Sequence, residues 1–163
     1  MNPMEDSMAT DTMMKAGKTE GRKTKSVARH IPTAARALMG LIFFASGIFG
    51  LLTALGIVPP PSAPMPAEAA AFAGALAKTG YMMPLTSGID LVVGALLLSN
   101  RFVPLALALI APVIVNIVAF HAFLAPSGIG IAVVVAALEI YLAWAYRKAY
   151  RPMLAPRAAT DAA

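Results

Sequence analysis

The sequence predicts an all-α integral membrane protein, a four-helix bundle with a short interfacial helix in its first outer loop. Three observations point to this fold class. Apolar residues make up 59% of the 163 residues and charged residues only 13%, whereas a soluble domain is about half apolar and about a quarter charged. The mean hydropathy is +0.74, and four apolar runs approach the ~20 residues that a membrane-spanning helix needs. All but one of the 13 lysines and arginines fall on one side of the predicted bundle.

The four apolar runs occupy residues 35–57, 81–99, 102–124 and 129–146. At about 1.5 Å per residue each run can cross a hydrocarbon core of about 30 Å, the last one only just. Because lipid offers the backbone no water to bond with, these runs should be helices. Buried helices of a soluble bundle are the alternative, and it is disfavoured because no run has a polar face wide enough to meet water.

The basic residues set the expected orientation and the domain limits. Twelve of the 13 lie in the two tails, at the start of the first run or in the link between the second and third runs, and Lys78 alone lies on the other side. This bias predicts that both termini are cytoplasmic in a cell (cytoplasmic or inner) membrane. We therefore expect a disordered basic cytoplasmic tail over residues 1–33, a four-span domain over 34–150 and a short cytoplasmic tail over 151–163. The net charge of +5 then suits anionic lipid and not nucleic acid.

The link between the first two runs is the only long one. Residues 58–66 contain three consecutive prolines and cannot form a regular helix. The Ala-rich stretch that follows is typical of a helix: Pro66 suits its start, Glu68 its first turn, Lys78 its last turn and Gly80 its stop. We expect this helix to lie on the outer membrane interface, and an ordinary surface helix is the equal alternative.

Polar residues inside the predicted spans are functional candidates, because a charge or an amide in hydrocarbon is costly. Asp90 lies in the second span, Asn116 and His121 in the third and Glu139 in the fourth. Helical rise places Asp90, Asn116 and Glu139 near one layer, with His121 roughly 10 Å further outward. Arg36, at the cytoplasmic end of the first span, can extend its charged head to the interface.

Small residues at helical spacing surround both carboxyls, and small faces are where membrane helices approach closely. We predict that Asp90 and Glu139 point into the bundle, lie within direct or one-water hydrogen-bond reach of each other and share a proton. The helix-packing residues are expected to be Ser46, Gly50, Ser87, Gly94 and Pro112.

The third span leaves several roles open. Pro112 frees a backbone carbonyl one turn earlier, and a kink there opens space beside Asn116 on the same face. Asn116 can bond a neighbouring helix, and His121 is shallow enough to meet water. The alternative for all four polar groups is that they only hold helices together. No second His or Cys accompanies His121, so we expect no metal. No catalytic residue is assigned, because no nucleophile, phosphate-loop or nucleotide motif is present.

The order and spacing of several segments resemble the DoxX family of small four-span membrane proteins. The segments are RALMGLIFFASG, FAGALAKTGYMMPLTSGIDLVVGALLL, RFVPLAL and PVIVNIVAFH, and they cover roughly residues 36–146. The resemblance implies that Asn116 and His121 occupy the family's Asn and His of the third span. The family usually has Glu where this chain has Asp90. Its name comes from a subunit associated with quinone-linked sulfur oxidation, and other members are implicated in redox-stress membrane complexes.

The leading functional hypothesis is a redox-associated membrane subunit that binds a quinone or another lipophilic ligand within the bundle. Asp90, Asn116 and Glu139 would bond its polar headgroup and His121 would pass protons outward. A small proton-coupled transporter is the second hypothesis, and a purely structural subunit of a membrane complex is the third. The expected partners are the lipid bilayer, redox partner subunits and further copies of the chain. We expect no enzyme activity from the chain on its own, although it can belong to a quinone-linked oxidoreductase complex.

Overall fold

The computed structural model describes residues 30–61 and 64–150, and all regular structure in these residues is helical. The first helix runs over His30–Ala54. It is followed by α2 (Ala67–Lys78), α3 (Met82–Leu98), α4 (Val103–Phe123), the 3₁₀ turn η1 (Pro126–Gly128), α5 (Ile129–Ala145) and the single turn α6 (Arg147–Tyr150). The all-α prediction is therefore confirmed. The predicted N-terminal tail up to residue 29 and the tail over 151–163 lie outside the described residues.

Three helices are each long and apolar enough to cross a membrane: His30–Ala54, Val103–Phe123 and the continuous Pro126–Ala145. The fourth candidate span is the pair α2 and α3, which meet at a bend of 91°. Large apolar side chains face outward on these helices, with Val115 exposed to 68%, Ile140 to 70% and Phe123 to 81%. Such surfaces are stable against lipid tails and not against water. The chain is thus a multi-pass membrane protein with three to four spans.

Two helix ends follow from residues that accept a left-handed backbone. Gly56 has φ 71°, and the Ile57 N–H donates to the Leu52 carbonyl over 2.9 Å, the pattern of a Schellman cap. The first helix therefore ends at Ala54, three residues before the predicted limit. Asn100, with φ 57°, ends α3 in the same way, because the Arg101 N–H donates to the Leu96 carbonyl over 3.1 Å.

The first helix also begins earlier than predicted. It starts at His30, inside the stretch up to residue 33 that was expected to be disordered. Pro32 falls in the first turn, where a missing N–H leaves no helical hydrogen bond unmade. The prediction for residues 30–33 was wrong because it took the onset of apolar sequence as the onset of the helix.

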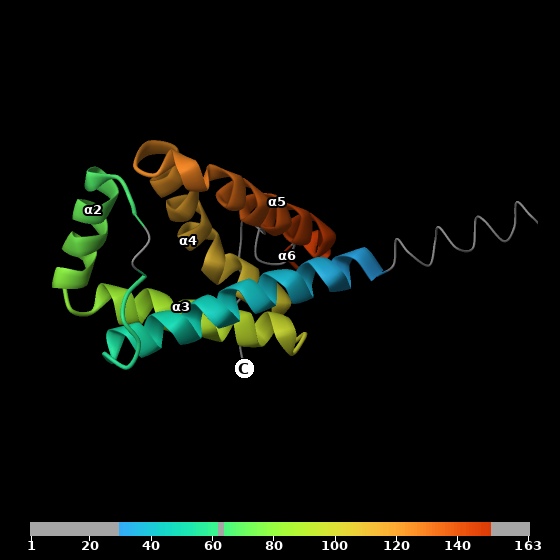
Figure 1. Ribbon diagram of the computed structural model, residues 1–163. Helices are drawn as coiled ribbons and strands as arrows, with labels where there is room; N and C mark the ends of the chain where they lie inside the picture. The colour runs from blue at the N-terminus through green and yellow to red at the C-terminus, as the bar shows by residue number, and fades with distance from the viewer. Residues whose placement is uncertain (1–29, 62–63, 151–163) are drawn as a thin grey trace, which may run out of the picture. The chain divides into compact units, whose positions relative to one another are not determined.

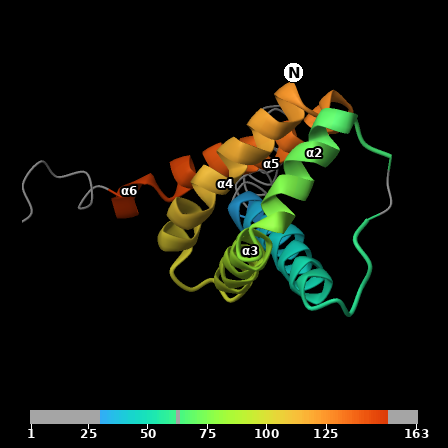
Figure 2. The same cartoon turned by 90° about the vertical axis from the view of Figure 1, so that its left-hand side faces the viewer.

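The short helix of the first outer loop is present. α2 has Pro66 as its N-cap residue, Glu68 in its first turn and Lys78 in its last, and Gly80 follows with φ 76°. In Figure 1 α2 stands across the end of α3, and α4 and α5 lie side by side, as they also do in Figure 2. The arrangement matters for function because it brings α2 against the far end of α4.

The core is formed where the first helix, α3, α4 and α5 face one another. Its fully buried large side chains are Met39, Val93, Leu97, Leu107, Ile110 and Leu142. The first helix and α3 approach so closely that a Cβ added at Gly47 would lie 2.7 Å from the Leu91 Cα, and one at Gly94 would lie 2.6 Å from the Phe44 Cα. Glycine is required at both positions because the two backbones leave no room for a side chain.

Candidate functional site

Asp90 lies at the contact between α3 and the first helix. The Ser46 hydroxyl donates to its Oδ2 over 3.2 Å. Its other oxygen, Oδ1, is buried and has no hydrogen-bond partner among the described residues. Ser87, one turn before Asp90, rests its hydroxyl against Gly50. The carboxyl is therefore held by one helix–helix hydrogen bond and keeps a second, unused acceptor.

The structure places four of the five predicted packing residues along this same contact. Ser46 and Gly50 face α3, and Ser87 and Gly94 face the first helix. Pro112 is different, because its side chain is exposed and lines a groove instead of a helix–helix contact. The packing role of Pro112 therefore stays a prediction.

Glu139 lies on α5 and faces α4. It is one of two buried charged side chains in the described part of the chain, with 9% of its surface exposed. Its Oε2 has no hydrogen-bond partner among the described residues. The carboxyl lines a hollow of about 250 Å³ between α4 and α5.

The predicted direct hydrogen bond between Asp90 and Glu139 is not formed in the described part of the chain. Asp90 bonds Ser46 of the first helix, whereas Glu139 faces α4 across the hollow. Helix α4 packs against both α3 and α5. Depth along the helices was predictable from residue counts, but the direction around each helix depends on which neighbour it packs against.

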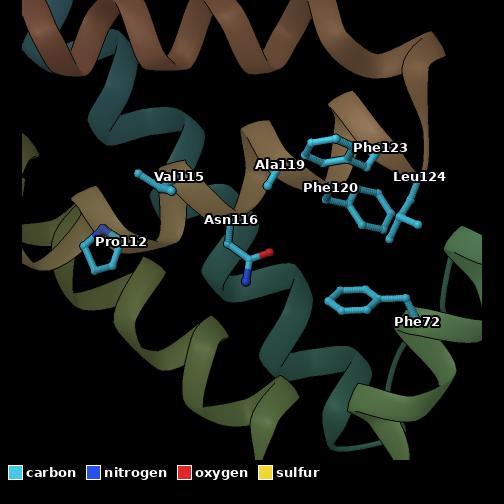
Figure 3. Close-up of a pocket in the computed structure, with 8 residues that line it drawn as sticks. All are labelled: Phe72, Pro112, Val115, Asn116, Ala119, Phe120, Phe123 and Leu124. Carbon is cyan, nitrogen blue, oxygen red and sulfur yellow. The ribbon is translucent and has the colours of Figure 1, made fainter.

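Asn116 opens onto a groove of about 580 Å³ that we call the Asn116 groove. Its walls are formed by Phe72 of α2 and by Pro112, Val115, Ala119, Phe120, Phe123 and Leu124 of α4 and its C-terminal end. Figure 3 shows the Asn116 amide pointing into this space, with the Phe72 ring on the opposite side. The Asn116 side chain is exposed. It is the one polar side chain in an otherwise apolar lining.

Two aromatic rings close one end of the Asn116 groove. The centroids of Phe72 and Phe120 are 5.8 Å apart with the ring planes at 41°, a favourable tilted arrangement. Neither ring was singled out from the sequence. The sequence offers little indication of this pair, because Phe72 reaches Phe120 only as a result of the bend between α2 and α3.

His121 does not line the Asn116 groove. Its Nδ1 lies 3.1 Å from the Ala125 carbonyl oxygen, its ring packs against Gly128, and its edge meets Phe120 at a centroid distance of 5.3 Å. The histidine thus ties the end of α4 to the η1 turn. Within the described residues no cluster of three His, Cys, Asp or Glu side chains is placed to hold a metal ion. The role of His121 in passing protons stays a prediction.

Arg36 was expected to extend its charge to the interface, and the structure buries it instead, with 8% of its surface exposed. Its guanidinium donates to the Leu97 carbonyl in the last turn of α3. A cation at a helix C-terminus offsets the partial negative charge of the unpaired carbonyls. The clue in the sequence was that the first and second spans run antiparallel, which places Arg36 beside the end of the second.

Replacing Asp90 with Asn should leave the fold intact. The Ser46 hydroxyl can donate to the amide oxygen as it does to the carboxylate, so the free energy of unfolding should change by less than about 1 kcal/mol. Thermal unfolding in detergent, followed by circular dichroism, measures it. Adding Ser46→Ala to each background is the control: it should cost the same in both. A loss in Asp90→Asn of more than about 3 kcal/mol would mean that the charge itself holds the helices.

Comparison of the chain with protein-family models, with curated proteins and with solved structures found no match. The resemblance to the DoxX family therefore stays a prediction. Two features remain: an amide in an aromatic groove between α2 and α4, and a buried carboxyl in a small hollow between α4 and α5.

Proposed function

We propose that the protein is a membrane subunit that binds a lipophilic ligand with a planar, carbonyl-bearing headgroup in the Asn116 groove, with a quinone as the leading candidate. The observation that carries this proposal is the exposed Asn116 amide in an aromatic and apolar lining. Asn116 lies about 5 Å from the middle of α4 at about 1.5 Å per residue. At that depth the bilayer offers no hydrogen-bond partner for an amide.

A quinone supplies what this groove lacks. A quinone carbonyl can accept a hydrogen bond from the Asn116 Nδ2, which removes the penalty of an unpaired amide. Its flat ring can pack against Phe72 and Phe120, and its apolar tail can leave through the open side of the groove beside Phe123. Pockets for such ligands are mostly apolar with a few placed polar groups, as here.

The redox association and the membrane belong to the same proposal. The resemblance to the DoxX family supports a subunit of a redox complex, with further subunits or copies of the chain as partners. The uneven distribution of basic residues supports the cytoplasmic or inner membrane with both termini cytoplasmic. In that orientation α2 and the Asn116 groove lie in the outer half of the bilayer.

A proton-coupled transporter is the second candidate, and one observation favours it. Glu139 is buried with an oxygen that has no partner among the described residues, and carboxyls of this kind line proton routes in membrane transporters. The predicted hydrogen bond between Asp90 and Glu139 is not formed among the described residues. The transporter reading therefore depends on Glu139 alone.

Replacing Asn116 with Leu tests the ligand proposal, because it removes the amide and keeps the branched shape of the side chain. Loss of one hydrogen bond should weaken binding of a radiolabelled short-chain quinone by about 5- to 30-fold, equivalent to about 1–2 kcal/mol. Equilibrium dialysis of the detergent-purified protein measures it. Thr86→Val is the matched control, since the Thr86 hydroxyl donates within its own helix to the Met82 carbonyl over 2.9 Å and lies outside the Asn116 groove.

Equal quinone affinity in the Asn116→Leu and Thr86→Val proteins would remove the ligand proposal and favour a purely structural subunit. If the wild-type protein binds no quinone even at saturating concentration, the ligand proposal is likewise removed. Retained binding with loss only in Asn116→Leu supports the groove as the site.

A further inference from the structure

The carboxyl of Glu139 is a buried polar group that the proposed quinone site does not use. It lies on α5, about 3 Å from the middle of the helix at about 1.5 Å per residue. Only 9% of the side chain is exposed, and Oε2 has no hydrogen-bond partner among the described residues. A buried polar atom without a partner is rare in folded proteins and calls for a physical reason.

The hollow beside Glu139 opens toward the lipid face and is otherwise apolar. Its lining is Ala111, Ile114, Val115 and Val118 of α4 with Ala136 and Ile140 of α5. The two side chains at its rim, Val115 and Ile140, are exposed to 68% and 70%, so small apolar molecules can reach the hollow from the membrane. The small side chains of Ala111 and Ala136 leave the space of about 250 Å³ beside the carboxyl.

No positive charge in the described part of the chain pairs with Glu139. The first helix contributes Arg36, whose guanidinium donates to the Leu97 carbonyl. On α6, Arg147 donates to the Trp144 carbonyl over 2.9 Å and stacks on the Trp144 ring, while Lys148 is exposed. Helix α4 contributes only His121, at its far end against Ala125, η1 has no ionisable side chain, and α5 itself contributes Tyr141.

Tyr150 of α6 is an ionisable group whose pKa responds to the charge of Glu139. The Tyr150 hydroxyl donates to the Pro104 carbonyl over 2.9 Å. Burial raises the pKa of Tyr150, and the negative charge of ionised Glu139 raises that pKa further.

We infer that Glu139 is a proton-binding site, held in an apolar hollow that opens to the lipid. An ionised carboxylate without a counter-charge is unstable in such surroundings, whereas the neutral acid is tolerated. The ligand of this site is the proton. The inference does not depend on a ligand in the Asn116 groove, and the two hollows share only Val115 among their lining residues.

Dicyclohexylcarbodiimide, an apolar reagent, tests the site. The carboxyl oxygen bonds to the central carbon of the carbodiimide and the acid proton moves to one of its nitrogens, so the whole reagent is added and nothing leaves. Only the protonated acid reacts in this way. We expect an adduct on Glu139 of the full-length protein in lipid vesicles, located by peptide mass spectrometry, with labelling that falls as the pH is raised.

Matched measurements separate this site from the other carboxyls. Glu139→Gln should lose the adduct, while Asp90→Asn and Asn116→Leu should keep it. A water-soluble carbodiimide with an added amine should modify exposed Glu68 of α2 and leave Glu139 unmodified. The location of the adduct in the wild type needs no variant, so a misfolded Glu139→Gln protein does not block the test.

The inference fails if the apolar reagent leaves Glu139 unmodified at every pH while the water-soluble reagent modifies Glu68. An adduct confined to Asp90, or one on Glu139 that does not change with pH, overturns it equally. Loss of quinone binding in Asn116→Leu with unchanged Glu139 labelling supports both sites as separate. Unchanged quinone binding with unchanged Glu139 labelling removes the ligand proposal alone.

Discussion

Replacing Gly94 with Ala should destabilise the bundle more than any other single methyl group added to α3. The new Cβ would lie 2.6 Å from the Phe44 Cα and closer still to the Phe44 nitrogen, so the first helix and α3 must move apart. Overpacking of this kind costs about 1–3 kcal/mol. We expect the upper end here, because the obstacle is backbone and not the flexible tip of a side chain. Unfolding in mixed detergent micelles, followed by Trp144 fluorescence, measures the loss.

The matched control is Gly88→Ala on the same helix. A Cβ at Gly88 meets nothing within 4 Å, and alanine is the better helix former by about 1 kcal/mol. This variant should therefore be neutral or slightly more stable. Equal behaviour of Gly88→Ala and Gly94→Ala would show that the close approach between the first helix and α3 does not hold in the folded protein.

Replacing Arg36 with Glu should be the most damaging change of charge. The guanidinium of Arg36 is buried and donates to the Leu97 carbonyl, and that carbonyl lies at the negative end of α3. A carboxylate there loses the charged hydrogen bond and faces the helix dipole with the wrong sign, which together cost about 3 kcal/mol. The yield of folded monodisperse protein on size exclusion and its free energy of unfolding both report this loss.

Arg36→Lys is the control for Arg36→Glu, because it keeps the positive charge and one donor. It should lose less than half as much stability as the charge reversal. If Arg36→Glu unfolds like the wild type, the contact with Leu97 contributes nothing and Arg36 serves only as a surface charge.

The fold class was predictable because the bilayer permits few structures. Long apolar runs must be helical in lipid, and all the expected helices are present with their limits shifted by at most five residues. The limits that moved depend on single residues. Gly56 and Asn100 adopt a left-handed backbone that apolar patterning does not reveal, and Pro32 extends the first helix backward instead of stopping it.

The candidate site was predictable in part. The spacing of four residues placed Pro112 and Asn116 on one face, and both line the Asn116 groove. The approach of Asp90 to Glu139 was not predictable, because equal depth does not fix the direction around a helix. The Ser46 hydroxyl donates to Asp90. The sequence alone does not identify this partner, because the bond depends on the close approach of the first helix and α3 at their glycines. The contact between the Phe72 and Phe120 rings depends on the bend between α2 and α3. The spacing of apolar residues along the sequence does not predict that bend.

The different lengths of neighbouring helices have a consequence for the surrounding lipid. Helix α3 has 17 residues and is about 26 Å long at about 1.5 Å per residue, whereas the 25-residue first helix reaches about 38 Å. A hydrocarbon core of about 30 Å is thicker than the length of α3 and thinner than the length of the first helix. Lipid tails beside α3 must shorten or disorder, while those beside the first helix must stretch unless that helix tilts. The protein should therefore deform the bilayer unevenly around its circumference, and it should partition preferentially into membranes whose acyl chains are short enough to meet α3 without strain.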